Sequence, residues 1–262
     1  MSVQAVTDTV PFAVPPTFEV HRGVLARSGV EEVRAFVARV LGNRPAAAEG
    51  EQDQGWAVDF RTLMAKGELE NPRQLIGVLK KSSVPELCRA ILGPGLAYSV
   101  DKSLIRDFDP GRRPAPAPMH FDAHVFGPHI RMLTVWVPLT PVGADAPGLS
   151  IARRPHWPLS YWNELAARVD DTGLYRRIDA SRRGLPQDEV LALARNESEW
   201  PLVEPRLDVG DVMIFDHQHI HGTQTGIEAP ARRMSMEVRV MRYKVAMDLI
   251  AGGLQQLFGS LD

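Results

Sequence analysis

The stretch from Val209 to Thr223 reads Val-Gly-Asp-Val-Met-Ile-Phe-Asp-His-Gln-His-Ile-His-Gly-Thr, and it decides the fold expected for this chain. A glycine–aspartate turn leads into a short apolar strand, and three histidines follow near the end of that strand. His217, His219 and His221 are spaced by two, so a continuing strand would place all three imidazoles on one side. The alternative interpretation is a solvated polar strand end whose histidines bind nothing.

A second stretch with metal-binding character lies earlier in the chain, where His120 and Asp122 are two residues apart. On an extended strand these two side chains project from the same face and can share one ion. An imidazole and a carboxylate suit a divalent metal of intermediate hardness, such as Fe(II). When this motif stands alone, a surface turn with a His–Asp hydrogen bond is the favoured interpretation. The metal hypothesis therefore depends on the two histidine-rich stretches together.

Arginines open the strand that follows the second histidine stretch, at Arg232 and Arg233. The planar fork of a guanidinium matches a carboxylate with two parallel hydrogen bonds. An arginine that enters the interior of a β-structure needs an anion there, because an unpaired buried charge is costly. The 5-carboxylate of 2-oxoglutarate would supply that anion. The alternative is an exposed arginine pair with no ligand.

Composition sets the broad class of the protein. The 262 residues are 44% hydrophobic, which is enough for one sizeable core, and we expect a single domain over residues 1–262. The formal net charge of −2 gives no argument for binding nucleic acid or an anionic membrane. The single cysteine, Cys88, cannot form an intrachain disulfide, and the N-terminus lacks the pattern of a signal peptide or membrane span. These features favour a cytoplasmic protein.

Periodicity predicts helices first and strands afterwards. An irregular arm over residues 1–20 precedes a helical N-terminal region at about 20–95, in which Ser28 and Glu31 have the spacing of a capping box. A β-rich core at about 98–243 follows, interrupted by a helical insertion at about 156–200. The expected strands are 98–108, 130–139, 148–152, 211–215 and 233–243, and the tail at 245–258 has helical character. This order fits a jelly roll with flanking helices.

Residues 98–243 resemble the phytanoyl-CoA dioxygenase-like branch of the Fe(II)/2-oxoglutarate-dependent oxygenases. The match includes His120-Phe-Asp122, the strand Val135-Trp-Val-Pro-Leu139, and His221-Gly-Thr223 after a Gly-Asp turn. Ala146-Pro-Gly-Leu149 fits a further strand of the family, but the end of that strand departs from the family pattern and leaves the role of His156 open. The resemblance implies a double-stranded β-helix, which is a cupin-like jelly roll.

The resemblance also implies a ligand set, in which His120, Asp122 and His221 bind the metal. The family places its co-substrate arginine about eleven residues after the distal histidine, and this spacing selects Arg232. A related Arg-x-Ser pattern selects Arg233 instead, together with Ser235.

Strand parity allows only one of the two arginines to point inward, and the spacing favours Arg232 narrowly. Thr223 and Ser103 are further candidates for contacts with the co-substrate. The sequence assigns no role to His124, His217 or His219.

The activity implied is an Fe(II)- and 2-oxoglutarate-dependent dioxygenase that consumes O2 and releases succinate and CO2. Its substrate would be a small organic molecule, such as a natural-product intermediate, an amino-acid derivative or an acyl thioester. Halogenases of this fold replace the carboxylate ligand with a small residue, so Asp122 favours hydroxylation, desaturation or epoxidation over halogenation. One alternative is a cupin-like metal-binding module without oxygenase activity, and another is a protein–protein interaction domain with structural histidines. The substrate, the type of oxidation and the oligomeric state stay open.

Overall fold

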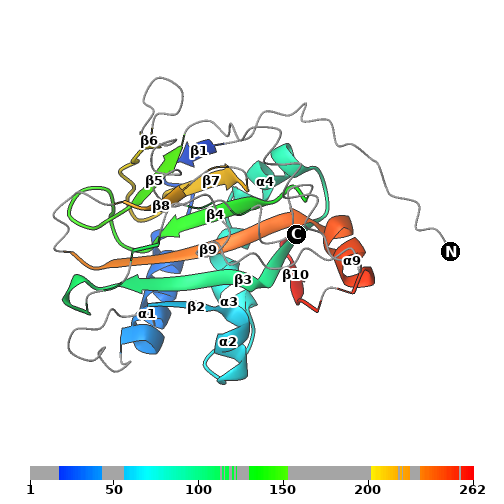
Figure 1. The fold of residues 1–262 in the computed structure, drawn as a ribbon, viewed down its shortest axis with the longest axis horizontal. Helices are drawn as coiled ribbons and strands as arrows, with labels where there is room; N and C mark the ends of the chain where they lie inside the picture. Colours follow the sequence, from blue (N-terminus) through cyan, green and yellow to red (C-terminus); the bar gives the residue numbers. More distant parts are fainter. Residues whose placement is uncertain are drawn as a thin grey trace.

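Two antiparallel sheets lie face to face in the computed structural model of this chain (Figure 1). The arrangement confirms the predicted double-stranded β-helix with flanking helices. The structure describes residues 18–42, 56–112, 114, 116–117, 120, 122, 130–152, 202–217, 219, 221–224, 231–253 and 255–262. The predicted helical insertion at about 156–200, His124 and His156 lie outside these ranges.

The larger sheet has seven strands, and β9 runs near its middle. Its strands follow the order β1-β7-β4-β9-β3-β10, and β2 pairs with β3. The bounds are β1 Phe18–His21, β2 Ala57–Asp59, β3 Leu96–Phe108, β4 Leu133–Pro138, β7 Val212–Asp216, β9 Arg233–Arg242 and β10 Phe258–Ser260.

The end of the predicted N-terminal arm is a strand rather than an irregular segment. Phe18–His21 forms β1 and pairs along β7, which would otherwise present an unpaired backbone edge. The prediction of an arm up to residue 20 was therefore wrong for its last residues, because pairing with a distant strand leaves little trace in a four-residue segment.

The smaller sheet has the order β6-β5-β8, with β6 Leu202–Val203, β5 Leu149–Ala152 and β8 His221–Thr223. His120 forms a β-bridge with His221, the first residue of β8. The His120 N–H donates to the His221 carbonyl at 2.8 Å, and the His221 N–H donates to the His120 carbonyl at 2.7 Å. The backbone thus sets these two histidines side by side.

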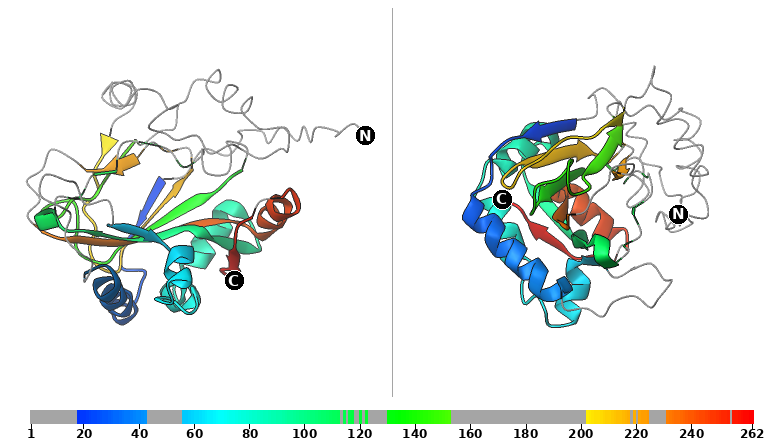
Figure 2. Two further views of the ribbon diagram at one scale, coloured as in Figure 1. Left: turned by 60° about the horizontal axis from the view of Figure 1, so that its bottom comes forward. Right: turned by 90° about the vertical axis from the view of Figure 1, so that its left-hand side faces the viewer.

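Helices cover the outer face of the larger sheet, opposite the smaller sheet (Figure 2). They are α1 Arg27–Gly42, α2 Phe60–Ala65, α3 Arg73–Lys80 and α4 Val84–Leu92, while η1 Pro110–Arg112 follows β3 and α9 Tyr243–Ala251 follows β9. Helix α1 begins one residue before Ser28, so the predicted capping box at Ser28 lies inside the first turn. The tail is helical only up to Ala251, before the Gly252-Gly253 pair.

Alternation along the central strands gives the larger sheet two different faces. The face toward the helices is apolar and includes Val135, Val137, Val238 and Val240. The face toward the smaller sheet carries the indole of Trp136 and the polar or charged side chains of Thr134, Glu237 and Arg239. Any site between the sheets must therefore use the second face.

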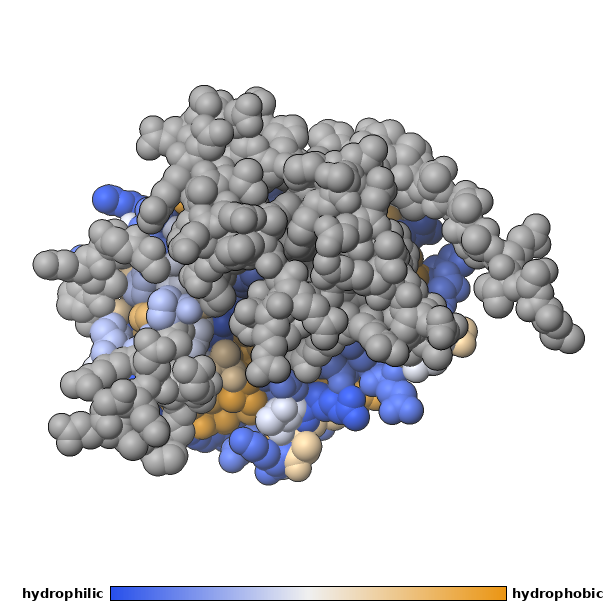
Figure 3. Space-filling model, in the orientation of Figure 1, coloured by the Kyte–Doolittle hydropathy of each residue, from blue (hydrophilic) through white to orange (hydrophobic). Residues whose placement is uncertain are grey.

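The surface of the molecule carries both hydrophobic and hydrophilic residues. On the side shown in Figure 3, hydrophobic residues gather in the lower half of the view, with hydrophilic residues around them. Among helices within the described ranges, none combines the length and the hydropathy that crossing a bilayer requires.

Gly143 is a backbone position where we expect the fold to tolerate a side chain poorly. Its φ is +91°, and an added Cβ would lie 2.7 Å from the Pro205 carbonyl oxygen and 2.8 Å from the Arg206 Cα. We predict that Gly143→Ala lowers the free energy of unfolding by about 2–4 kcal/mol, measured by urea denaturation.

The matched control is Gly67→Ala, at a φ of +71° with no atom within 4 Å of the added Cβ. This change carries the conformational strain alone and should cost about 1 kcal/mol. Equal losses for the two variants would contradict the proposed clash at Gly143.

Candidate active site

Three metal-binding side chains converge between the sheets. One ligand atom each from His120, Asp122 and His221 lies within 4.8 Å of the others. His221 Nε2 is 4.0 Å from Asp122 Oδ2, and the two imidazole centroids are 4.3 Å apart. Asp122 and His221 are buried, whereas His120 is partly exposed. Two imidazoles and one carboxylate at this spacing fit a single divalent cation.

The local geometry of these residues differs from the strand that the sequence predicted. His120 forms an isolated β-bridge, and Asp122 lies in a turn. The three later histidines do not share a strand either, because β7 ends at Asp216 and β8 begins at His221. The chain passes from the larger sheet to the smaller one between these residues, so a spacing of two no longer fixes a common face.

The crossing gives each of the three histidines a different neighbour. His217 Nδ1 lies 2.5 Å from Asp216 Oδ1, and His219 Nδ1 lies 3.0 Å from the Ala152 carbonyl oxygen. Of the three, His221 belongs to the group that can share an ion with Asp122. His217 and His219 therefore help to hold the crossing segment, and His221 faces the candidate metal centre.

A hydrogen bond fixes the tautomer of His221. Its Nδ1 is 3.0 Å from the His219 carbonyl oxygen. Since a carbonyl can only accept, Nδ1 must donate, and the lone pair of Nε2 is left to face Asp122. Burial lowers the pKa of His221, although the Asp122 carboxylate opposes this shift. The neutral imidazole is the form that binds a metal.

Asp122 is held as a carboxylate by two neighbours that the sequence interpretation missed. Thr134 Oγ1 donates to Oδ2 at 2.6 Å. Arg239 Nη2 donates to Oδ1 at 3.1 Å, and Arg239 Nε lies 3.0 Å from Oδ2. Burial alone would raise the pKa of Asp122, but Arg239, the two imidazoles and the Thr134 hydrogen bond together hold it below its usual range. Asp122 is therefore charged and oriented.

A chain of alternating charges continues from Asp122 along the interior face. Arg239 Nη1 donates to Glu237 Oε2 at 3.1 Å, and Arg106 Nε donates to Glu237 Oε1 at 2.5 Å. Burial opposes the charge on Glu237, but Arg106 and Arg239 outweigh it and lower the pKa of Glu237 to about 2. A period of two from Arg233 through Glu237 to Arg239 was the sequence signal for this row.

Arg233 is a buried cation near the start of β9, and it is 1% exposed. Its Nη1 donates to the Gly148 carbonyl at 3.0 Å, and its guanidinium lies over the rings of Phe108 and Trp56 at 5.2 and 5.5 Å. Burial, and then the nearby Arg106, lower the pKa of Arg233 to about 9. Within the ranges that the structure describes, no carboxylate forms an ion pair with Arg233.

Three buried polar atoms accompany this cation without a hydrogen-bond partner in the described part of the chain. They are Arg233 Nε, Ser235 Oγ and Trp136 Nε1. Arg233 and Ser235 share the interior face of β9, and Trp136 lies on the same face of β4. Buried polar groups normally have a partner, so these atoms indicate a place for a polar ligand. An anionic ligand would also balance the charge of Arg233.

Arg232 points to the opposite side of the sheet. Its Nε and Nη2 donate to the two oxygens of Asp107 at 2.5 and 2.6 Å, and its side chain is 36% exposed. The parity argument that only one of the two arginines can face inward is consistent with this placement.

Ser103 and Thr223 use their hydroxyl groups for backbone contacts. Ser103 Oγ accepts from the Arg239 N–H at 3.2 Å, at an irregularity in the pairing of β3 with β9. Thr223 Oγ1 accepts from the Ala117 N–H at 3.0 Å and thereby helps to attach residue 117 to the edge of β8. Both hydroxyls therefore have structural roles in this arrangement.

A family profile described as "Phytanoyl-CoA dioxygenase (PhyH)" matches residues 18–234 of the sequence. The chain belongs to this family. The match runs from β1 to the second residue of β9, includes the four helices that cover the larger sheet, and contains all three residues of the candidate metal centre.

One curated relative of this phytanoyl-CoA dioxygenase family member is the 1-deoxypentalenic acid 11-beta-hydroxylase of Streptomyces exfoliatus. The two sequences are 30% identical over 125 residues, which is 47% of this chain and 40% of the relative. The matched region thus spans less than half of the hydroxylase.

Solved structures show the same fold at low sequence identity. The alpha ketoglutarate-dependent carbocyclase SnoK from nogalamycin biosynthesis has a TM-score of 0.59 at 18% identity, covering 91% of this chain and 85% of SnoK. EctD from S. alaskensis, solved with 2-oxoglutarate and 5-hydroxyectoine, has a TM-score of 0.59 at 15% identity, covering 88% of this chain and 73% of EctD. The epimerase SnoN, solved with Fe3+, alpha ketoglutarate and nogalamycin RO, has a TM-score of 0.54 at 18% identity, covering 87% and 80%.

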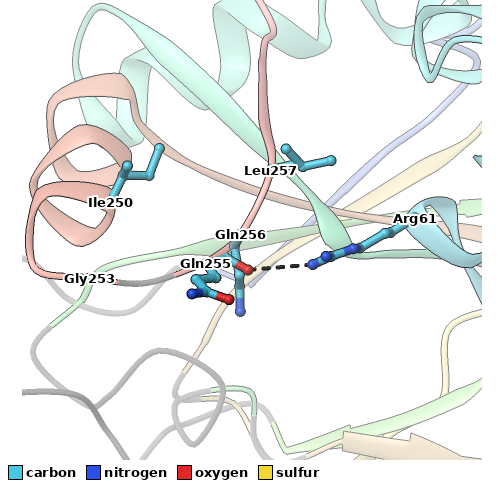
Figure 4. A pocket seen from close by; sticks show the side chains of 6 residues that line it. All are labelled: Arg61, Ile250, Gly253, Gln255, Gln256 and Leu257. Atoms are coloured by element: carbon cyan, nitrogen blue, oxygen red, sulfur yellow. Dashed lines mark hydrogen bonds between the residues drawn. The ribbon is translucent and has the colours of Figure 1, made fainter.

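A separate hollow of about 510 Å³ lies beside the segment after α9 (Figure 4). Its lining is Arg61, Ile250, Gly253, Gln255, Gln256 and Leu257. The charged group there is already engaged, because Arg61 Nη1 donates to Asp101 Oδ1 at 2.6 Å and to the Gln255 carbonyl at 3.4 Å. None of the three candidate metal ligands lines this hollow.

The different neighbours of the late histidines lead to a test by metal titration. We predict that His221→Ala weakens binding of Co(II), measured anaerobically by calorimetry, by about 100-fold or more, because one of three ligands is lost. The matched variant His217→Ala should change the dissociation constant by about threefold or less, since His217 contacts Asp216 rather than Asp122. A larger loss for His217→Ala than for His221→Ala would contradict the assigned ligands.

Proposed function

We propose that this chain is an Fe(II)- and 2-oxoglutarate-dependent oxygenase that hydroxylates a small organic substrate. The convergence of His120, Asp122 and His221 carries the proposal. Two histidines and one carboxylate form the ligand set of non-haem iron oxygenases, which leave metal positions open for co-substrate and O2. Membership of the phytanoyl-CoA dioxygenase family supports the same activity.

The buried polar atoms of Arg233 and Ser235 support binding of the co-substrate beside them. A distal carboxylate of 2-oxoglutarate would give the buried guanidinium an anion and give Arg233 Nε and Ser235 Oγ an acceptor. Arg232 already has a carboxylate partner in Asp107 and faces the other side of the sheet. We therefore assign co-substrate binding to Arg233 and Ser235, and we favour Arg233 over the residue selected by spacing.

The chain's own residues contribute orientation and charge. When bound, iron and 2-oxoglutarate supply oxidation of a C–H bond by O2, with release of succinate and CO2. The His219 carbonyl keeps the His221 imidazole in the tautomer whose Nε2 is free to bind the metal. Thr134 and Arg239 orient Asp122, and Asp122 itself favours hydroxylation over halogenation because it occupies the position that a halide would need.

A natural-product intermediate is the substrate class that the relatives favour. The curated relative is named as the hydroxylase of 1-deoxypentalenic acid, and two fold neighbours come from nogalamycin biosynthesis.

We propose one catalytic domain for the chain, because both sheets contribute to a single interior cluster. A reducing, cytoplasmic setting agrees with Cys88, which is buried and free.

Co-substrate consumption tests this proposal. With Fe(II), O2 and a pool of small hydrophobic acids and polycyclic natural products, we expect succinate to form in proportion to 2-oxoglutarate consumed. Arg233→Gln should raise the KM for 2-oxoglutarate about 30-fold or more, because a charge-assisted fork to a buried carboxylate is lost.

Arg232→Gln is the matched control, and it should leave that KM within about threefold of the wild-type value. A large effect at Arg232 with none at Arg233 would reverse the assignment of the arginine. A protein that binds metal but neither binds nor decarboxylates 2-oxoglutarate would be a cupin-like module rather than an oxygenase.

A further inference from the structure

Asp122 has a cation beside it before any metal is considered. Both carboxylate oxygens lie close to the Arg239 guanidinium, at 3.1 and 3.0 Å, and Arg239 is only 4% exposed. One hydrogen bond to the carboxylate would suffice to orient Asp122, and Thr134 Oγ1 already donates one at 2.6 Å. Arg239 adds a full positive charge to the neighbourhood of the candidate metal centre.

The positive charge of Arg239 has opposite effects on the two species that would bind at the site, the metal ion and 2-oxoglutarate. It repels a divalent cation that binds Asp122, and it attracts the dianionic co-substrate that binds next to the cation. The interior of the protein screens these effects less than water does, so they persist over several ångströms.

We propose that Arg239 sets the relative affinities of the site, weakening the binding of a bare divalent cation and strengthening the binding of 2-oxoglutarate. This inference rests on the proposed function. Arg239 is a positioning residue in this view, because it acts through Asp122 and through its charge.

The negative charge of Glu237 opposes the effect of the Arg239 charge on the site. It accepts from Arg239 Nη1 at 3.1 Å and forms an ion pair with Arg106, and its low pKa keeps it negative. Its charge should therefore attract the cation and repel the co-substrate, which is the reverse of the effect of Arg239. Two neighbouring side chains thus predict opposite outcomes, and this opposition distinguishes a charge effect from general damage to the site.

Anaerobic titrations test the inference without turnover. For Arg239→Gln, which keeps a hydrogen-bond donor but removes the charge, we expect Co(II) alone to bind roughly tenfold more tightly than to wild type. We expect 2-oxoglutarate to bind the Co(II)-saturated variant roughly tenfold more weakly. Damage to folding or to the orientation of Asp122 would weaken both ligands, and that result would overturn the proposal.

Two further variants complete the series. Arg239→Lys keeps the charge but loses the fork, so both dissociation constants should stay within about threefold of wild type. Glu237→Gln should weaken Co(II) binding and tighten 2-oxoglutarate binding, each by roughly tenfold. The Glu237→Gln result decides the question if Arg239→Gln fails to fold, and unchanged or parallel shifts in that variant would overturn the proposal.

Failure of this inference is distinguishable from failure of the proposed function. If wild type binds no Co(II) through His221, or binds no 2-oxoglutarate, the oxygenase assignment fails. If wild type binds both ligands but the charge variants shift both affinities in the same direction, the oxygenase assignment stands and only the role of Arg239 is wrong.

Discussion

The site depends on two backbone hydrogen bonds between His120 and His221. They join parts of the chain that are far apart in sequence and fix the Cα positions of two metal-ligand candidates before any side chain is considered. Asp122 then reaches the same centre from a turn. Because β8 has only three residues, the geometry tolerates no slip in register: a shift of one residue would replace the His221 imidazole with Gly222.

Strand β9 contributes the buried charged residues beside the candidate metal centre. Its outward residues pack on the helices and need only be apolar, whereas its inward residues form a line of charges at Arg233, Glu237 and Arg239. Such a line is costly unless each charge has a partner, and within the described residues all but Arg233 have one. The exception, Arg233, is therefore the residue of this line that an anionic ligand would balance.

Much of the fold followed from local patterns, because buried strands such as residues 133–138 are rich in β-branched and aromatic residues. The metal-ligand candidates followed from spacing and family resemblance. The sequence did not reveal the sheet crossing between His217 and His221, since a spacing of two looks the same in one strand or in a passage between sheets. It also did not reveal Arg239, whose importance arises from a turn residue more than a hundred positions earlier.

His120 bridges to β8, the last strand in the order of the smaller sheet, and its side chain is partly exposed. A cation shared by His120 and His221 would add a side-chain link to the backbone hydrogen bonds that already join these two residues. Occupancy of the centre would then govern how often this edge frays, and slow amide exchange at His120 and His221 would report the loaded state. The bound ion would thus also stabilise the pairing of His120 with β8.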